Sequence, residues 1–404
     1  MFQRILDEKP SVLKKIVPVY GDLTKPGLAL SDKHLDLVIK NSEIVFHLAA
    51  TLKLEATLKQ AVEMNLVGTK NVVDVCKKMP KLIQMMHLST AFCCSEHDVL
   101  EERIYEWKWD NPKNLISSAN LMSDETMQAM EITMLKTQPN TYTLTKRLTE
   151  IMMRDEFNNN FPVTIVRPSI VTPAYQEPMP GWVDSLNGPI GLMIGAAKGV
   201  IRSMLVDGEL AAEVIPVDLA INALIMITKD VITLKKKPIE IPVYNVTVSE
   251  KKKTKMSWVL ETGKKINFDF PFEAGLWYPD GGITTNKFIH QFNVIFFHWL
   301  PAYFIDFLML ILGQKRFMIH VQNKVSQGLE VLQFFTMRNW NFKADKMKEI
   351  LKNMTPEEYD MFFIDSESVK DDYEYLKKSI LGGRQYCLKE PLSTLPKARI
   401  QLRL

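Results

Sequence analysis

Short apolar runs alternate with longer segments of helical periodicity in the first half of the chain, and this alternation restricts the fold more than any other feature. Between the second and third runs, residues 57–79 carry apolar side chains at helical spacing, and a second helix is predicted over residues 141–157. The runs are Ile16–Val19, Ile44–Leu48, Leu82–Leu88 and Val163–Val166, and residues 214–217 and 243–248 add two later strands around a helix at 218–227. Strands that are apolar along their length and separated by helices favour a parallel sheet covered on both faces. The sequence therefore predicts an α/β fold.

Composition excludes several classes of protein. The 404 residues suggest about two domains, and a hydrophobic content of 46% is enough for a full core. Fifty Lys and Arg against 47 Asp and Glu give a net charge of +3, which argues against a nucleic-acid partner. The four cysteines contain no CxxC pair, so we expect no metal site.

The most apolar stretch of the chain is Phe292–Leu312, which is long enough to cross a bilayer. It contains Asp306, which would be costly at mid-depth, and Pro301 interrupts its centre. We therefore expect two short helices hinged at Pro301 that lie on a membrane or line an apolar tunnel. A true membrane span is the alternative. The chain beyond residue 325 reads as helical and charged.

Tyr142 and Lys146 lie one turn apart in the predicted helix, so both project from the same face. A tyrosine phenol titrates near pH 10 and is a poor acid or base at neutral pH by itself. A neighbouring ammonium stabilises the phenolate and brings it into a useful range. The alternative is an exposed pair without function, because a YxxxK pattern occurs by chance in many helices.

Ser89 and Thr90 follow the apolar strand that ends at Leu88. In open α/β sheets, ligands bind beyond the carboxyl ends of the strands, where such hydroxyls are available to a substrate carbonyl. Ordinary capping of the strand end is the alternative.

Further residues at predicted strand ends are candidates for binding a cofactor. Leu48, Ala49 and Ala50 are suited to close packing against a flat ligand, and the carboxylate of Asp22 could accept a hydrogen bond from an adenine amino group. Asn65 is unusual inside a helix, and we expect it to hold backbone or water in a proton path. A last group, in which the proline turns the chain towards the site, is Arg167, Pro168 and Ser169.

These pieces, in this order, resemble the extended short-chain dehydrogenase/reductases. A closer resemblance, to the alcohol-forming fatty acyl-CoA reductases, covers nearly the whole chain. It is carried by Pro139–Tyr142, Arg167–Val171, Pro180–Trp182, Asn187–Pro189, Gly195–Gly199, Ile215–Asp218 and Ser393–Arg399.

The resemblance implies a Rossmann-like, doubly wound parallel sheet over residues 1–270, followed by a mainly α-helical "sterile" domain over residues 271–404. It also implies reduction of a long-chain fatty acyl-CoA to a primary alcohol by NADPH, through an aldehyde. Tyr142 would be the acid and Lys146 its partner, with Thr90 and Ser89 supplying hydroxyls. Membrane association at the cytosolic face of the endoplasmic reticulum or of the peroxisome is implied as well.

The same resemblance predicts that the sheet is incomplete at its N-terminus. Members of the family open with a strand and a TGxxGxxG phosphate-binding turn, and no such turn precedes Ile16. Two alternatives follow. The chain could be another extended reductase, acting on a sterol or an aldehyde, or a non-catalytic protein associated with lipid or membrane. Chain-length preference and oligomeric state are not predicted by the sequence.

Overall fold

The chain forms two compact units whose segments interleave along the sequence. The computed structural model describes residues 3–106, 112–135, 138–234, 236 and 238–403. Unit 1 comprises residues 1–169, 221–247 and 341–363, and unit 2 comprises residues 170–220, 248–340 and 364–404. The boundary predicted at residue 270 divides the chain in sequence order and stays a prediction.

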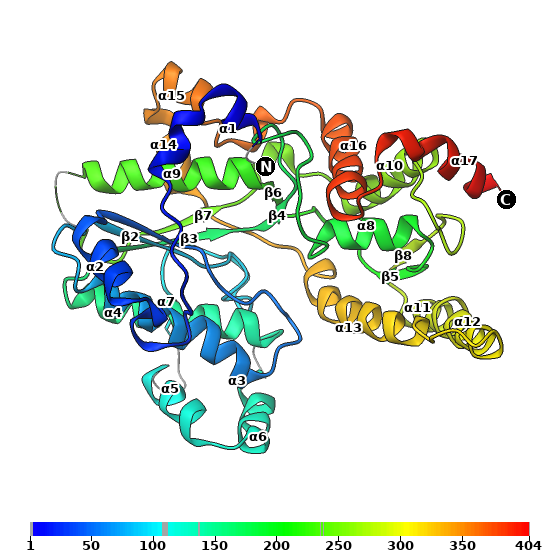
Figure 1. Cartoon of the computed structure of the whole chain (residues 1–404), viewed down its shortest axis with the longest axis horizontal. Coiled ribbons are helices and arrows are strands. Elements are labelled where there is room, and N and C mark those ends of the chain that lie inside the picture. The colour runs from blue at the N-terminus through cyan, green and yellow to red at the C-terminus, as the bar shows by residue number, and fades with distance from the viewer. Residues whose placement is uncertain (1–2, 107–111, 136–137, 235, 237, 404) are drawn as a thin grey trace. The chain divides into compact units, whose positions relative to one another are not determined.

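Unit 1 contains a four-stranded parallel sheet in the order β1-β2-β3-β7 (Figure 1). Its strands are β1 (Ile44–His47), β2 (Gln84–Leu88), β3 (Val163–Pro168) and β7 (Val243–Val246). The register pairs His47 with His87, and His87 with Ile165. Because all four strands run the same way, their carboxyl ends share one edge. The predicted α/β fold is thus confirmed, and the predicted runs that begin at residues 44, 82, 163 and 243 contain β1, β2, β3 and β7, with β2 beginning two residues later than predicted.

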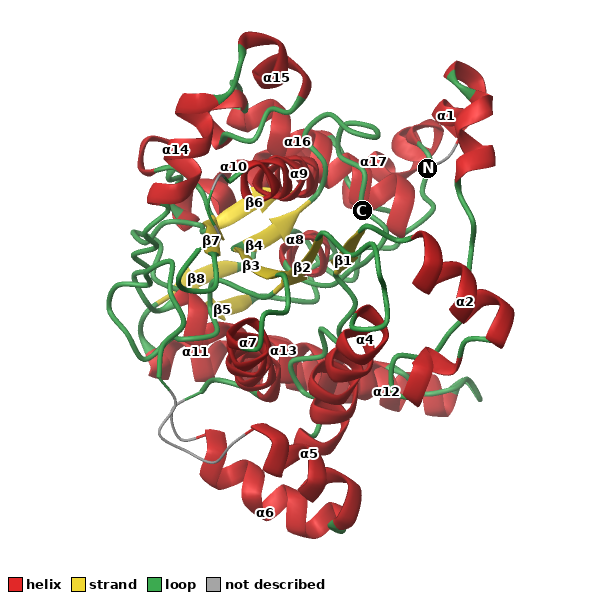
Figure 2. Cartoon of the chain, turned by 90° about the vertical axis from the view of Figure 1, so that its left-hand side faces the viewer, coloured by secondary structure: helices red, strands yellow, loops and turns green. Residues whose placement is uncertain are grey.

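Helices cover both faces of this sheet. The helices α4 (Gly68–Cys76) and α7 (Thr141–Asn158) lie on one face and α9 (Val217–Thr233) lies on the other (Figure 2). The core between α4, α7 and the sheet buries Leu66, Met85, Leu144 and Ile165 completely. The other helical elements of unit 1 are α1 (Gln3–Glu8), η1 (Pro10–Lys15), η2 (Pro26–Ala29), α2 (Asp32–Asn41), α5 (Pro112–Leu121), α6 (Asp124–Met134), α14 (Asp345–Asn353) and α15 (Pro356–Met361).

The helix predicted over residues 57–79 is present with an irregular centre. It consists of α3 (Leu58–Ala61), the π-turn η3 (Val62–Val67) and α4. A π-turn shifts the hydrogen-bond register by one residue and is frequent at functional sites. Asn65 lies within this π-turn.

Unit 2 is mostly helical and contains two small parallel pairs of strands. β4 (Ile170–Thr172) pairs with β6 (Val214–Pro216), and β5 (Ser203–Leu205) pairs with β8 (Gly282–Thr284). One apolar core joins Ile194, Ile266, Phe272 and Ile380. The helical elements are α8 (Pro189–Ala197), η5 (Glu250–Lys252), α10 (Met256–Asp269), α11 (Lys287–Val294), η6 (Ile295–Trp299), α12 (Leu300–Ile311), α13 (Met318–Thr336), η7 (Ser366–Ser368), α16 (Asp372–Gly382), η8 (Gly383–Cys387), η9 (Leu392–Thr394) and α17 (Leu395–Arg403).

Two local predictions are wrong. Ile16–Val19 is not a strand, because Ile16 and Val17 are more than half exposed and Pro18 has no N–H for a ladder. Pro301 is not a hinge, since α11, η6 and α12 form one helix from Lys287 to Ile311. The π-turn η6 changes the hydrogen-bond register just before Pro301 and so accommodates the missing N–H.

Candidate active site

The carboxyl end of β2 brings two buried hydroxyls to the shared edge of the sheet. The backbone N–H of Ser89 donates to the Val166 carbonyl over 2.7 Å, and that of Ala91 donates to the Pro168 carbonyl over 3.0 Å. These bonds continue the pairing with β3, so Ser89 and Thr90 are fixed and almost completely buried. Among the described residues, the Ser89 hydroxyl has no hydrogen-bond partner.

Helix α7 supplies Tyr142 and Lys146 to the same edge. It begins there because the Asn140 side chain caps it, accepting the Thr143 N–H over 2.9 Å. The Thr90 hydroxyl is hydrogen-bonded to the Tyr142 phenol. The Lys146 Nζ atom donates to the Leu88 carbonyl over 2.6 Å and lies 6.0 Å from the centre of the Tyr142 ring. Tyr142, Lys146 and Thr90 therefore form one cluster at this edge.

Burial determines the titration of this cluster. Loss of solvent raises the pKa of Tyr142 above its ordinary value, Cys93 raises it further, and the hydrogen bond with Thr90 opposes the change. Burial also lowers the pKa of Lys146 to about 8, against the raising effect of Glu150. Tyr142 thus keeps its proton at neutral pH, and Lys146 loses its charge only a little above it.

Asn65 ties α7 to the segment that follows β1. Its Oδ1 atom accepts the Thr51 N–H over 2.8 Å, and its Nδ2 atom donates to the Thr145 hydroxyl over 3.0 Å. Its own carbonyl accepts the Thr69 hydroxyl over 2.6 Å. The side chain thus holds the backbone of Thr51 and binds the hydroxyl of Thr145, one residue before Lys146.

The structure removes the Arg167 side chain from the candidate cofactor contacts. Its Nε and Nη2 atoms donate to the two carboxylate oxygens of Glu150 over 2.8 and 2.5 Å. Further donors bind the carbonyls of Glu101 and Arg103, each over 3.0 Å. Both charged groups are buried, so this guanidinium holds α7 to β3 and has little capacity left for a ligand.

Glu150 of this ion pair also belongs to a compact group of potential metal ligands. Cys93, Cys94 and Glu150 place ligand atoms within 4.8 Å of one another. The Cys93 thiol donates to Glu150 over 3.3 Å, and burial raises the pKa of that thiol well above its ordinary value. Arg167 already neutralises the carboxylate that a cation would need, so the group is better suited to packing than to binding metal.

The remaining strand ends carry the other candidate cofactor contacts. Pro168 is the last residue of β3, and Ser169 behind it is buried with a hydroxyl that has no partner among the described residues. Leu48 and Ala49 follow β1 and are exposed, and Ala50 is half-buried. Small exposed side chains beside two unpaired hydroxyls fit the amide and ribose of a nicotinamide cofactor.

Asp22 lies in a separate turn that packs on α4. Its carboxylate accepts the N–H and the hydroxyl of Thr24 over 2.9 and 2.8 Å, and these bonds lower its pKa. Asn71 of α4 anchors the turn by donating to the Leu23 carbonyl over 2.8 Å. Asp22 is exposed, and its lowered pKa keeps the carboxylate ionised at neutral pH. Its oxygens can therefore accept a hydrogen bond from an adenine amino group.

A pair of buried histidines beside Lys146 was not predicted as part of the site. The rings of His47 and His87 lie 5.6 Å apart on β1 and β2. His47 shares a 2.9 Å hydrogen bond with Thr69, whereas neither ring nitrogen of His87 has a partner among the described residues. Burial, and next the charge of Lys146, lowers the pKa of both rings, that of His47 to about 4. A histidine inside an otherwise apolar strand is the sequence signal that could have identified His87.

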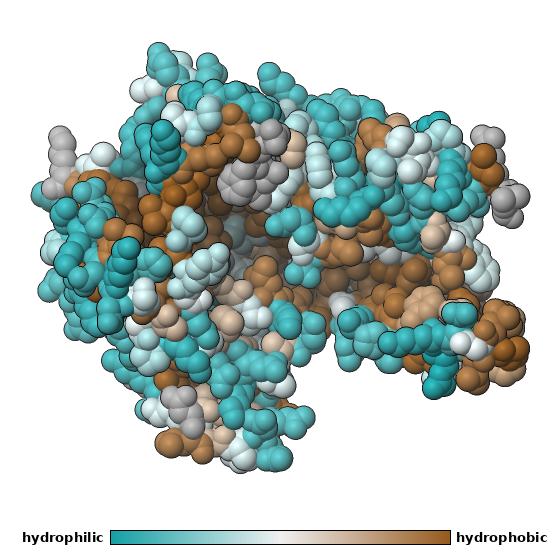
Figure 3. Space-filling model, viewed as in Figure 1, coloured by the Kyte–Doolittle hydropathy of each residue, from teal (hydrophilic) through white to brown (hydrophobic). Residues whose placement is uncertain are grey.

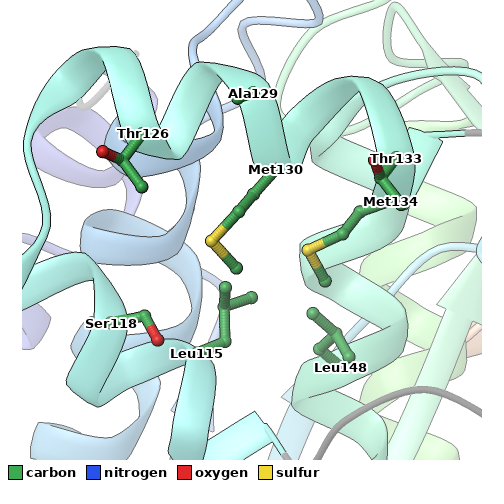
Figure 4. Close-up of a pocket in the computed structure, with 8 residues that line it drawn as sticks. All are labelled: Leu115, Ser118, Thr126, Ala129, Met130, Thr133, Met134 and Leu148. Carbon is green, nitrogen blue, oxygen red and sulfur yellow. The ribbon is translucent and has the colours of Figure 1, made fainter.

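An apolar pocket of about 410 Å³ lies between α5, α6 and α7 (Figure 4). Leu115, Met130, Met134 and Leu148 point into it. Leu148 is six residues beyond Tyr142, which places it about 240° further around α7. The pocket therefore lies on a different face of the helix from the reactive groups.

Taken together, a half-buried tyrosine and a buried lysine beside hydroxyls at the carboxyl edge of a parallel sheet are typical of an oxidoreductase that uses a nicotinamide cofactor. Comparison with known proteins agrees. Two family models, both described as male sterility protein, match the chain: an NAD-binding model at residues 1–224 and the Sterile model at residues 297–390.

Curated relatives narrow the class to one family. A putative fatty acyl-CoA reductase of Drosophila melanogaster is 33% identical over 393 residues, which are 96% of this chain and 76% of that protein. Fatty acyl-CoA reductase 2 of Mus musculus is 33% identical over 410 residues, covering 100% of this chain and 77% of that protein. The chain belongs to the fatty acyl-CoA reductase family.

A solved structure supports the predicted Rossmann-like fold. The terminal R domain from the myxalamid PKS-NRPS biosynthetic pathway superposes with a TM-score of 0.58 at 14% identity. The match covers 93% of this chain and 76% of that chain. The Rossmann-like fold with a helical C-terminal region is therefore confirmed.

Proposed function

We propose that this protein reduces long-chain fatty acyl-CoA to a primary alcohol with NADPH, through an aldehyde. The observation that carries the proposal is the cluster of Thr90, Tyr142 and Lys146 at the carboxyl edge of the sheet. Each turnover consumes two NADPH and two protons and releases one CoA thiol.

NADPH, when bound, supplies the hydride for each reduction. Tyr142 donates its phenolic proton to the carbonyl oxygen as negative charge develops there, and the Thr90 hydroxyl hydrogen-bonds the same oxygen. The ammonium of Lys146 stabilises the phenolate that remains. In the first reduction the protonated adduct expels CoA as its thiol to leave the aldehyde, and in the second the protonated product is the alcohol.

The pKa of Tyr142 is raised in the resting chain, so Lys146 does not bring the phenol towards neutral pH as the sequence pattern predicted. The phenol keeps its proton until a strongly basic oxyanion develops beside it. Ser89 and Ser169 would bind the nicotinamide end of the cofactor, beside Leu48, Ala49 and Ala50. Asp22 would accept from the adenine.

The direct test is turnover of palmitoyl-CoA by the purified full chain, with NADPH or NADH, followed by mass spectrometry of the lipid product. Hexadecanol formed with NADPH supports the proposal. Tyr142→Phe should lower turnover by roughly 100-fold or more while acyl-CoA still binds. Tyr244→Phe is the matched control, because Tyr244 is a buried tyrosine of unit 1 whose hydroxyl donates to Asp230 instead.

Other outcomes separate the alternatives. Reduction of free hexadecanal without reduction of palmitoyl-CoA would indicate a different extended reductase. Failure to bind either nicotinamide cofactor would indicate a non-catalytic lipid-associated protein. Equal turnover by wild type and Tyr142→Phe would contradict the assignment of the acid.

We also propose that the protein works at a membrane, at the cytosolic face of the endoplasmic reticulum or of the peroxisome. Within the described residues, one helix is long and apolar enough to cross a bilayer, judged by length and composition alone. Imaging of a fluorescent fusion against markers of both organelles tests the compartment.

A further inference from the structure

The helix from Lys287 to Ile311 has its polar and apolar faces reversed relative to a helix of a soluble protein. It is 25 residues long, and 17% of its most apolar stretch is buried. The side chains turned into unit 2 are His298, Ala302 and Asp306, spaced four residues apart along one stripe. Soluble helices bury an apolar stripe and expose the polar one.

The two polar groups of this stripe are bound to unit 2. The His298 Nε2 atom accepts the backbone N–H groups of Arg202 and Ser203 over 2.8 and 3.2 Å. Asp306 accepts three consecutive N–H groups, those of residues 317, 318 and 319, over 3.0, 2.8 and 3.0 Å. Asp306 thereby caps α13 and closes the hairpin between α12 and α13. The long helix is attached to unit 2 at its centre and near its end.

The opposite side of this helix is exposed and apolar. Between Phe288 and Leu312, a range that is fully described, Gln291 and the Tyr303 hydroxyl are the only polar side-chain groups at exposed positions. The exposed apolar face consists of Phe288, Ile289, Phe292, Ile295, Phe296, Phe297, Leu300, Tyr303, Phe304, Phe307, Leu308, Leu310, Ile311 and Leu312. Figure 3 shows apolar side chains gathered over α11 and α12. A face of this extent on a soluble surface marks an interaction site.

Charge around this face favours an anionic surface. Between Asp280 and Glu330 the sequence has four Lys or Arg residues and one acidic residue, Asp306, which is buried. Lys315 and Arg316 are exposed in the turn directly after the helix, where Gly313 adopts a φ of +64°. Aromatic and aliphatic side chains beside basic ones are typical of helices that lie in the headgroup region of a membrane.

We propose that the exposed apolar face of residues 288–312 inserts into one leaflet of an anionic phospholipid bilayer, with its helix lying along the membrane plane. The inference deepens the membrane association proposed above and rests on it. At about 1.5 Å per residue the helix would reach across a bilayer core of roughly 30 Å. Crossing would take His298 and Asp306 away from the backbone groups that they bind, leaving a buried histidine and a carboxylate unpaired in hydrocarbon. Lying flat keeps every one of these bonds.

Flotation of the purified full chain with lipid vesicles tests the proposal. Wild type should float with vesicles that contain phosphatidylserine and bind more weakly to phosphatidylcholine alone. Phe304→Glu with Phe307→Glu should lower the bound fraction at least tenfold, and Lys315→Glu with Arg316→Glu should remove the preference for anionic lipid. Ile239→Glu is the matched control, because Ile239 is 98% exposed in unit 1 and should leave flotation unchanged. NADPH binding reports whether each variant is folded.

Orientation is tested by cysteines placed at Lys287 and Gln314, exposed residues that flank the two ends of the face. An impermeant maleimide added outside sealed vesicles should label both sites, as read by peptide mass spectrometry. Labelling of one end alone would show that the helix crosses, which overturns the proposal. Flotation of Phe304→Glu/Phe307→Glu equal to wild type overturns it too, as does a wild-type dimer that ignores vesicles and becomes monomeric in this variant. Turnover of palmitoyl-CoA by wild type in the absence of vesicles separates these failures from failure of the proposed reaction.

Discussion

The charge of Lys146 should produce the alkaline limb of the pH profile. Burial brings the pKa of this lysine to about 8, so its charge is lost as the pH rises through that value. The charged fraction then falls from about 90% at pH 7 to about 10% at pH 9. If the ammonium is needed to stabilise the Tyr142 phenolate, kcat/KM for NADPH-dependent reduction should fall about tenfold over this interval. An ordinary lysine, with a pKa near 10.5, would leave the rate almost unchanged.

The assay is initial-rate kinetics with hexadecanal between pH 6 and pH 10, at constant ionic strength. Lys146→Arg stays charged throughout, so whatever activity it retains should lack the limb. Lys346→Arg is the control, because burial lowers the pKa of Lys346 as well and its ammonium donates to the carbonyls of Glu102 and Val243 instead. The reasoning is refuted if wild-type kcat/KM is flat to pH 10, or if the limb disappears in Lys346→Arg and persists in Lys146→Arg.

Three further substitutions separate chemistry from structure. Thr90→Val removes the hydrogen bond to Tyr142 and should lower kcat roughly 100-fold with unchanged NADPH affinity; weaker NADPH binding with normal kcat would contradict this role. Glu150→Gln leaves the Arg167 guanidinium buried without its counter-charge and should lower the free energy of unfolding by about 3–5 kcal/mol. Glu150→Leu combined with Arg167→Met should recover most of that stability. Hydrogen exchange of α7 measures both effects, and equal protection in wild type and Glu150→Gln would refute this prediction. Asn65→Ala leaves the Thr51 N–H without its partner and should lower the free energy of unfolding by about 1–3 kcal/mol. The loss should appear as faster hydrogen exchange in α3 and α4. Unchanged exchange would show that the hydrogen bonds of the Asn65 side chain are dispensable for stability.

Where one local pattern settled the answer, the sequence was sufficient. The runs that form β1, β2, β3 and β7 are short and mostly apolar. Apolar runs of this length are typical of strands in a parallel sheet. Tyr142 and Lys146 share a face because the helical repeat requires it, and Thr90 meets them because the carboxyl ends of parallel strands share an edge.

Three predictions failed because residue type and spacing do not show which hydrogen bonds a segment makes. Arg167 was predicted to bind cofactor because it ends a strand, yet Glu150, seventeen residues earlier, takes its guanidinium. Ile16–Val19 has the composition of a strand and lacks a neighbour to pair with. Pro301 reads as a break, but the π-turn before it lets the helix continue. A distant hydrogen-bond partner thus decided the role of Arg167, the lack of a pairing strand decided the structure of Ile16–Val19, and a change of helical register decided that of Pro301.

The interleaving of the two units has a consequence for how the protein is made. The fourth strand of the sheet, β7, is synthesised only after the chain has supplied residues 170–220 to unit 2, and α15, the last helix of unit 1, ends at Met361. Unit 1 therefore cannot be completed on the ribosome until the segment that ends at residue 363 has emerged. During that interval the growing chain exposes the unpaired edge of β3. Unpaired strand edges are prone to aggregation, so chaperones are expected to bind the chain at this stage of synthesis.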